Sequence, residues 1–324
     1  MKIIYKNRPH NSDKKDVDGI RYIYTEGVEG FASIGDFAQM PNKLIRGKHK
    51  NRVAQVFWSK PARLDFKAAR WHIANQYELT LPLAALSLAM LKELGQEVVL
   101  YTDTDGLHLL GDLPYDRVYS VFDKLNVHSD FWACGKILAL QNEPLDSLLV
   151  DTDIFVYDGQ ILDKAFTADV VGSHLESTAA YIELLKFGQE NFAHLSGDID
   201  TSTNTGFMKI SNMHKKQQFI WAYWAAINQF SNPELLSKLK AYGKGAFCID
   251  LVAEPLNFHK ICELKHLIDL SEHWREANGF VHLLSMTKYL VIPFVLELLD
   301  HRYPEYYAKV LHSWGRIGFE VSYD

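Results

Sequence analysis

The stretch Ser147–Gly159, SLLVDTDIFVYDG, places two aspartates, Asp151 and Asp153, inside an apolar run. Such a run is typical of a buried strand, and a buried carboxylate is costly unless it is paired or binds a metal. Side chains alternate faces along a strand, so the pattern predicts one extended segment with both carboxylates on the same side. Hard divalent cations prefer oxygen ligands of this kind. We therefore expect a metal site at the two aspartates, and a hydrogen-bonded structural pair is the alternative.

The same triplet, Asp-Thr-Asp, also occurs earlier, at 103–105, in the run EVVLYTDTDGLHLLG. Here it follows a predicted strand and leads into Asp-Gly, which is ordinary chemistry for a turn or a helix entry. A structural role is sufficient for this copy, so we do not expect the metal at Asp103.

Strands and helices alternate on both sides of the quoted stretch. Short β-type runs occupy 53–58, 96–102 and 116–121, and helical patterns occupy 76–95, which ends at a glycine, and 129–140. This alternation predicts an α/β fold with a mostly parallel sheet. Beyond it the pattern is mixed, with predicted strands at 168–174, 204–210, 263–269 and 280–284, and predicted helices at 176–191, 213–230 and from residues 287 and 304 onward.

Three segments are predicted along the chain. Residues 1–51 are rich in basic residues and turn formers, which is typical of a peripheral segment. Residues 52–288 form the α/β domain. Residues 289–324 form an aromatic-rich helical extension that packs on it.

Composition excludes several classes of function. Of the 324 residues 48% are hydrophobic, enough for a large core, and the net charge of -6 leaves no basic footprint for nucleic acid. The three cysteines show no C-x-x-C spacing, so neither a disulfide framework nor a thiolate zinc site is expected. The N-terminus lacks the apolar region of a signal peptide, and no apolar run approaches the ~20 residues that span a bilayer. We expect a cytoplasmic protein, free or peripheral to the inner face of the membrane.

Several short motifs resemble those of a known superfamily. Residues 131–153, FWACGKILALQNEPLDSLLVDTD, resemble the segment that leads to the D-x-D motif of metal-dependent glycosyltransferases of the GT-A fold. Residues 280–288, FVHLLSMTK, are similar to the late H-x5-K element of glycogenin-like and bacterial lipopolysaccharide- or capsule-type sugar transferases. Residues 202–210, STNTGFMKI, resemble their N-x-G stretch. Ser285 departs from the glycine of that pattern, and Tyr289 and Leu290 replace its usual Pro-Trp.

The resemblance implies a GT-A (Rossmann-like) fold and a Mn²⁺ or Mg²⁺ ion bound by Asp151, Asp153 and His282. It implies that Phe57, Trp58 and Ser59 hold the base and that Lys288 reaches the diphosphate of the donor. Asp200 and Glu254 are candidate nucleophiles of a retaining enzyme. The implied catalytic set therefore comprises Asp151, Asp153, Asp200 and Glu254. The implied donor-binding set comprises Phe57, Trp58, Ser59, Asp103, Lys136, Thr152, Asn204, Gly206 and Lys288.

Together with the aspartate pair, the resemblance implies a metal-dependent glycosyltransferase of glycan or surface polysaccharide synthesis. Its expected partners are a UDP- or GDP-sugar donor and a glycan or lipid-linked acceptor. Two alternatives stay open: a metal-dependent phosphohydrolase or nucleotidyltransferase, and a GT-A relative that binds nucleotide sugars without turnover. The chain has no G-x-x-x-x-G-K-[ST] loop, no H-E-x-x-H helix motif and no G-x-S-x-G elbow, which disfavours the hydrolytic classes that need them.

Overall fold

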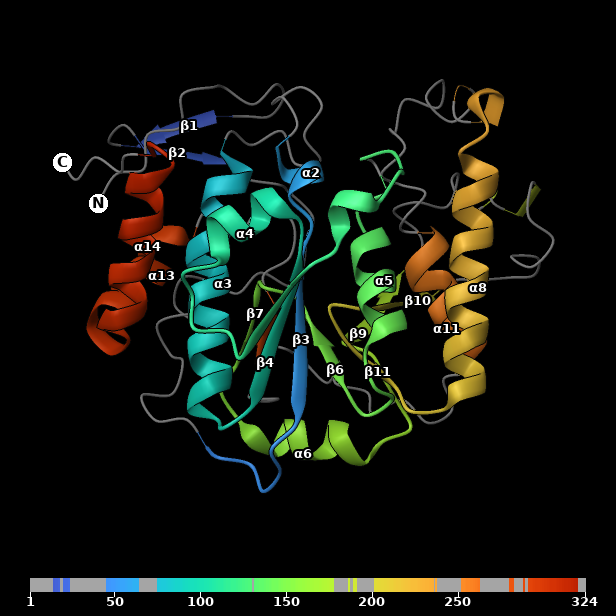
Figure 1. The fold of residues 1–324 in the computed structure, drawn as a ribbon, viewed down its shortest axis with the longest axis horizontal. Coiled ribbons are helices and arrows are strands. Elements are labelled where there is room, and N and C mark those ends of the chain that lie inside the picture. Colours follow the sequence, from blue (N-terminus) through green and yellow to red (C-terminus); the bar gives the residue numbers. More distant parts are fainter. Residues whose placement is uncertain are drawn as a thin grey trace.

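A mixed sheet of six strands lies at the centre of the protein, between two layers of helices (Figure 1). The computed structural model describes residues 14–17, 20–23, 45–63, 75–129, 131–177, 186, 189–190, 201–235, 237, 252–262, 280–282, 288 and 291–319. The predicted strand at 263–269, most of the predicted helix at 176–191 and the candidate nucleophile Asp200 lie outside these residues.

The central sheet has the strand order β5-β4-β3-β6-β11-β8. The four strands β3, β4, β5 and β6 run parallel, whereas β11 is antiparallel to both β6 and β8. Their bounds are β3 (Arg52–Phe57), β4 (Glu97–Thr102), β5 (Arg117–Ser120), β6 (Leu148–Val150), β8 (Val170–Val171) and β11 (Phe207–Ile210). The predicted fold class, a mostly parallel α/β sheet flanked by helices, is confirmed.

Both faces of this sheet are buried, which is why its strands read as apolar runs. Along β3, Val53 and Phe57 pack into one hydrophobic cluster, and Ala54 packs into the other. The first cluster also contains residues of α3 (Gln76–Glu93), α4 (Thr104–Leu110), α6 (Gly159–Thr167), α13 (Ile292–Arg302) and α14 (Pro304–Arg316). The second contains residues of α5 (Cys134–Asn142), α8 (Met213–Phe230) and α11 (Asn257–Cys262).

The helix α3 is apolar on all sides because the sheet covers one side and the C-terminal helices α13 and α14 cover another. Pro82 lies inside it and has no N–H to donate to the carbonyl of Glu78 one turn earlier. The indole Nε1 of Trp314, on α14, donates to that carbonyl at 2.9 Å. The helix ends before Gly95, whose φ of 84° lies in the left-handed region that glycine tolerates. The predicted helix and its glycine stop are therefore confirmed.

The Asp-Thr-Asp stretch is not one extended strand, and that prediction is wrong. The strand β6 ends at Val150, and β7 (Ile154–Val156) begins after a turn in which the N–H of Ile154 donates to the carbonyl of Asp151 at 3.1 Å. The strand β7 leaves the central sheet and pairs with β12 (Phe280–His282). The turn separates the two aspartates from the regular strands β6 and β7, inside which two unpaired charges would be costly.

Other boundaries also differ from the predicted ones. The helix predicted from residue 129 starts at Cys134, and residues 176–177, predicted as helical, belong to β9 (His174–Ser177), which pairs with β10 (Thr201–Asn204). The short elements that complete the described fold are β1 (Lys14–Val17), β2 (Ile20–Ile23), α2 (Ser59–Ala62), η1 (Phe122–Lys124) and the π-helix η4 (Val252–Leu256).

The end of the predicted peripheral segment is hydrogen-bonded to the backbone between β7 and α6. The N–H of Ile45 donates to the carbonyl of Tyr157, and the N–H of Gly159 donates to the carbonyl of Ile45 at 2.6 Å. Gly47 crosses Gly159 so closely that a Cβ on Gly159 would lie 2.1 Å from the nitrogen of Gly47. Across the described ranges, no helix combines the length and apolar character needed to cross a bilayer.

Candidate metal centre

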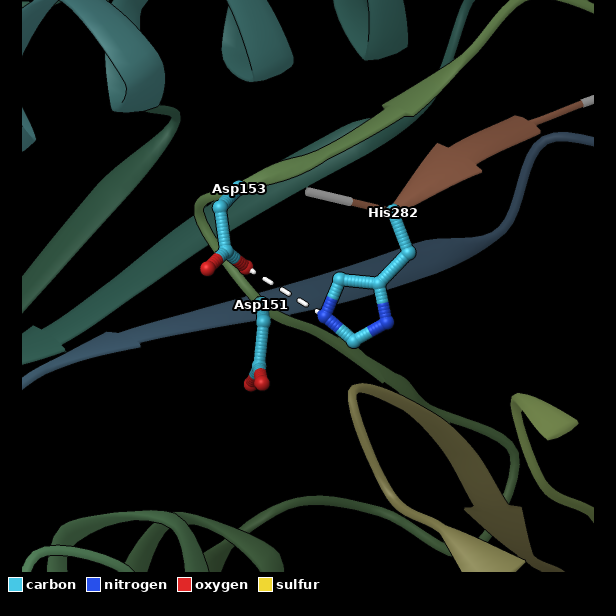
Figure 2. Close-up of side chains that lie close together, drawn as sticks. All are labelled: Asp151, Asp153 and His282. Atoms are coloured by element: carbon cyan, nitrogen blue, oxygen red, sulfur yellow. Dashed lines mark ion pairs between the residues drawn. The ribbon is translucent and has the colours of Figure 1, made fainter. Parts of the chain in front are cut away.

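Two sheets bring Asp151, Asp153 and His282 together. The aspartates lie in the turn between β6 and β7, at the carboxyl edge of the parallel strands. The antiparallel pairing of β12 with β7 sets His282 opposite Ile154, beside this turn. Figure 2 shows the imidazole of His282 turned toward the two carboxylates. One ligand atom from each residue lies within 4.8 Å of the others.

The buried atoms of this group fit a divalent cation. The Oδ1 atom of Asp153 is buried without a hydrogen-bond partner among the described residues, and it faces the Nε2 atom of His282 at 3.7 Å. In an octahedral shell with metal–oxygen distances of about 2.1 Å, neighbouring ligand atoms lie about 3 Å apart. The three side chains would therefore need only small shifts to hold an ion, and carboxylate oxygens suit Mg²⁺ or Mn²⁺.

Each aspartate is also paired with a lysine. The Nζ atom of Lys288 lies 2.8 Å from Oδ2 of Asp153, and the Nζ atom of Lys136 lies 3.1 Å from Oδ1 of Asp151. Burial opposes the charge of Asp153, but Lys288 and His282 outweigh burial and lower its pKa. Burial raises the pKa of Asp151 to about 6, with Lys136 opposing the rise and Asp153 adding to it. The two carboxylates thus lie in different electrostatic environments.

Lys136 lies in the interior of the fold, and the donor contact predicted for it stays a prediction. Its Nζ atom is 3.2 Å from Oε1 of Glu254, and it donates to the carbonyl of Thr205 at 3.3 Å. The ring of Trp132 lies 5.7 Å from the same atom. Burial favours loss of the proton, but Asp151 and Glu254 raise the pKa of Lys136 above its ordinary value. Lys136 is therefore a fixed internal cation.

Gly206 fits against the imidazole of His282. Its carbonyl accepts from the N–H of Asp151 at 2.7 Å, and its N–H donates to Oδ1 of Asn204 at 2.8 Å. A Cβ at this position would lie 2.5 Å from Cε1 of His282. The absence of a side chain at Gly206 leaves room for the ring of His282, and the approach to a ligand predicted for this glycine stays a prediction.

The residues predicted to hold the base form a second cluster, where β3 and β4 end. Phe57, Trp58 and Ser59 are buried. The Oδ2 atom of Asp103 accepts from the N–H and the hydroxyl of Ser59, and its Oδ1 atom accepts from the N–H of Gly106 as the N-cap of α4. The helix-entry role predicted for this first triplet is confirmed, and its donor contact stays a prediction.

Sequence reasoning missed Thr205 and Trp132, both of which contact Lys136. Thr205 lies inside the Asn-Thr-Gly stretch that the resemblance singled out, so its neighbours were the signal for it. Trp132 precedes Lys136 by four residues, so the helix predicted at 129–140 carried a spacing signal for this contact, although α5 itself starts only at Cys134. Thr152 lies in the turn between the two aspartates, where it is half-buried.

No curated protein matches the sequence. The chain is structurally similar to the glycosyltransferase GlyE of Streptococcus pneumoniae TIGR4, with a TM-score of 0.39 and 12% identity; the match covers 85% of this chain and 66%, just under two thirds, of the GlyE chain. For the apo form of GlyE the TM-score is 0.34 with 14% identity, and the match covers 83% and 64%.

Mouse xyloside xylosyltransferase 1, in its apo form, is also similar, with a TM-score of 0.32 and 12% identity over 67% of this chain and 82% of that chain. A family model matches residues 51–313, which is more than half of the chain. The protein therefore belongs to the family that this model describes, DUF6734, a family of unknown function.

Proposed function

We propose that the protein is a metal-dependent glycosyltransferase that moves a sugar from a nucleoside diphosphate donor to an acceptor hydroxyl. The observation that carries this proposal is the Asp151–Asp153–His282 group at the carboxyl edge of the sheet. The two aspartates of this group follow β6. The strands β4 and β5 lie on one side of β3 and β6 lies on the other, so the order of the strands reverses between β3 and β6. Open α/β sheets bind their ligands in the crevice at this position.

The three side chains would hold a Mn²⁺ or Mg²⁺ ion. When bound, such an ion supplies Lewis-acid stabilisation to a diphosphate leaving group, which no side chain protonates efficiently at neutral pH. Lys288 is the cation that can turn toward a diphosphate oxygen, because its side chain keeps 19% of its surface exposed. The side chain of Lys136 is only 6% exposed, and it is proposed to act on the candidate metal ligand Asp151 rather than directly on the donor.

The donor is proposed to be a UDP- or GDP-sugar, and the acceptor a glycan or a lipid-linked glycan. The residues at the ends of β3 and β4 are proposed to flank the base. Retention of the anomeric configuration, which the resemblance implies, is a separate prediction that NMR spectroscopy of the product would test.

Calorimetric titration of UDP and GDP, with and without Mn²⁺, tests the proposal. Nucleotide binding should require Mn²⁺ and should be lost in Asp151→Asn and Asp153→Asn. The matched control is Asp105→Asn, which alters an exposed aspartate of the other triplet that is paired with Arg63. Metal-independent binding, or equal loss in the control variant, would contradict the assignment of the site.

A screen of sugar nucleotides then separates the reaction classes. A glycosyltransferase releases the nucleoside diphosphate, whereas a phosphohydrolase cleaves the diphosphate with water and releases a nucleoside monophosphate and a sugar 1-phosphate. A protein that binds the nucleotide sugar but releases no product with any acceptor would be a non-catalytic relative.

A further inference from the structure

We propose that Glu254 sets the affinity of the metal centre through Lys136, although Glu254 is not itself one of the candidate ligands. The inference rests on the metal site of the proposed function and adds a positioning residue to it. Glu254 would offset the charge of the ammonium next to Asp151, so that this ammonium competes less with the ion for the carboxylate.

One ammonium lies between two carboxylates. The Nζ atom of Lys136 is 3.1 Å from Oδ1 of Asp151 and 3.2 Å from Oε1 of Glu254. Lys136 and Glu254 are both buried: the side chain of Lys136 is 6% exposed and that of Glu254 is 0% exposed. Charges placed this way are little screened by water, so each acts strongly on its neighbours.

The charge of Lys136 alone would work against an ion. An ammonium at 3.1 Å competes for the oxygens of Asp151 and repels a divalent cation bound to them. Glu254 supplies one negative charge 3.2 Å from that ammonium and offsets part of its effect at Asp151. The affinity of the metal centre therefore depends on Glu254, which contacts the candidate ligand Asp151 only through Lys136.

The Thr205–Gly206 dipeptide fixes this arrangement. The hydroxyl of Thr205 donates to Oε1 of Glu254 at 2.7 Å, and its carbonyl accepts from Lys136 at 3.3 Å. The next residue, Gly206, accepts from the N–H of Asp151 at 2.7 Å. Changing Glu254 to Gln keeps an oxygen for Thr205, so this variant removes the charge while it preserves the contacts.

The second oxygen of Glu254 supports a role for this carboxylate beyond its contacts within the fold. Its Oε2 atom is buried and has no hydrogen-bond partner within the described residues. An incompletely bonded buried carboxylate destabilises a fold. Its charge therefore has a different use, and the contacting group that needs this charge is Lys136.

Mn²⁺ titration without nucleotide, followed by the EPR signal of the free ion at one fixed pH, tests the inference. Glu254→Gln should weaken Mn²⁺ binding by about tenfold or more. The double variant Lys136→Met with Glu254→Gln removes both charges and should restore the affinity to within about threefold of the wild type. The control is Glu97→Gln, which removes a carboxylate paired with Arg52 at 2.7 Å, at the opposite edge of the sheet, and should leave the affinity unchanged.

Several results would overturn the inference. Equal affinity in Glu254→Gln and the wild type, or a double variant as weak as Glu254→Gln, would exclude charge balance. If Glu254→Gln does not fold, Lys136→Met must bind Mn²⁺ more tightly than the double variant, and equal affinity overturns the inference. If Asp151→Asn loses Mn²⁺ binding and Glu254→Gln has no effect, the role of Glu254 is refuted and the metal site stands. If the wild type binds no Mn²⁺, the proposed metal site is refuted as well.

Discussion

Replacing Gly206 by alanine should displace His282 from the metal centre. The new Cβ would lie 2.5 Å from Cε1 and 3.0 Å from Nε2 of the imidazole. Gly206 does not have a left-handed φ, so alanine adopts its backbone conformation without strain. The new Cβ would also lie 3.0 Å from Oδ1 of Asn204, so its closest contact, and the main effect of the substitution, is at the ring of His282.

The size of the displacement follows from these contacts. The imidazole would have to retreat by about 1 Å to reach an ordinary carbon–carbon separation. Its Nε2 atom already lies 3.7 Å from Oδ1 of Asp153, so a retreat would open the group further. A disturbed ligand geometry of this kind costs about 10- to 100-fold in metal affinity.

The assay is a Mn²⁺ titration followed by EPR spectroscopy, together with thermal unfolding of the apo protein. Gly206→Ala should bind Mn²⁺ at least about tenfold more weakly and remain folded. The matched control is Gly315→Ala on α14, where a Cβ meets nothing within 4 Å. That variant should keep its Mn²⁺ affinity and gain about 0.5–1 kcal/mol of stability, as alanine does in a helix. Unchanged Mn²⁺ affinity in a folded Gly206→Ala protein would refute the role of His282 as a ligand.

Two further predictions concern stability. Glu143→Gln should lower the free energy of unfolding by about 2–3 kcal/mol at neutral pH, because the buried carboxylate accepts two hydrogen bonds from Arg52, at 2.8 and 2.9 Å, and one from Tyr101. Burial alone would raise the pKa of Glu143, but these hydrogen bonds lower it, so its contribution is present above 4.5, its ordinary value, and is lost as the pH falls below it. Urea unfolding at several pH values should show the difference from the wild type shrinking on acidification, and a constant difference would contradict this account. Trp314→Phe should cost about 1–2 kcal/mol in the same assay, because the carbonyl of Glu78 loses the donor that replaces the missing helix N–H; no loss would mean that another donor serves this carbonyl.

The sequence predicted those elements whose boundaries depend on local signals. The helix predicted at 213–230 coincides with α8, because Asn212 caps its start and accepts from the N–H of Lys215. The glycine stop of α3 was predicted for the same reason. Each of these signals lies within a few residues of the boundary that it sets.

The candidate site depends on contacts that no local pattern contains. The runs before Asp151 and after Asp153 are both apolar, so periodicity could not show that β6 and β7 belong to different sheets. The pairing of β7 with β12 decides where His282 lies, and the sequence proposed that residue only through a family resemblance. The pair of Lys136 with Glu254 joins distant parts of the chain and has no spacing rule.

The turn at Asp151–Asp153 joins the six-stranded sheet to the β7–β12 pair, so an ion bound there would link these two sheets directly. Binding to the folded state alone raises the free energy of unfolding by about 2.7 kcal/mol when the free ion is at a hundred times its Kd. Because this link includes His282 at the end of β12, removal of the ion by a chelator should lower protection from hydrogen exchange first in β7 and β12. The central strands β3 and β4, which do not contribute a candidate ligand, should keep theirs.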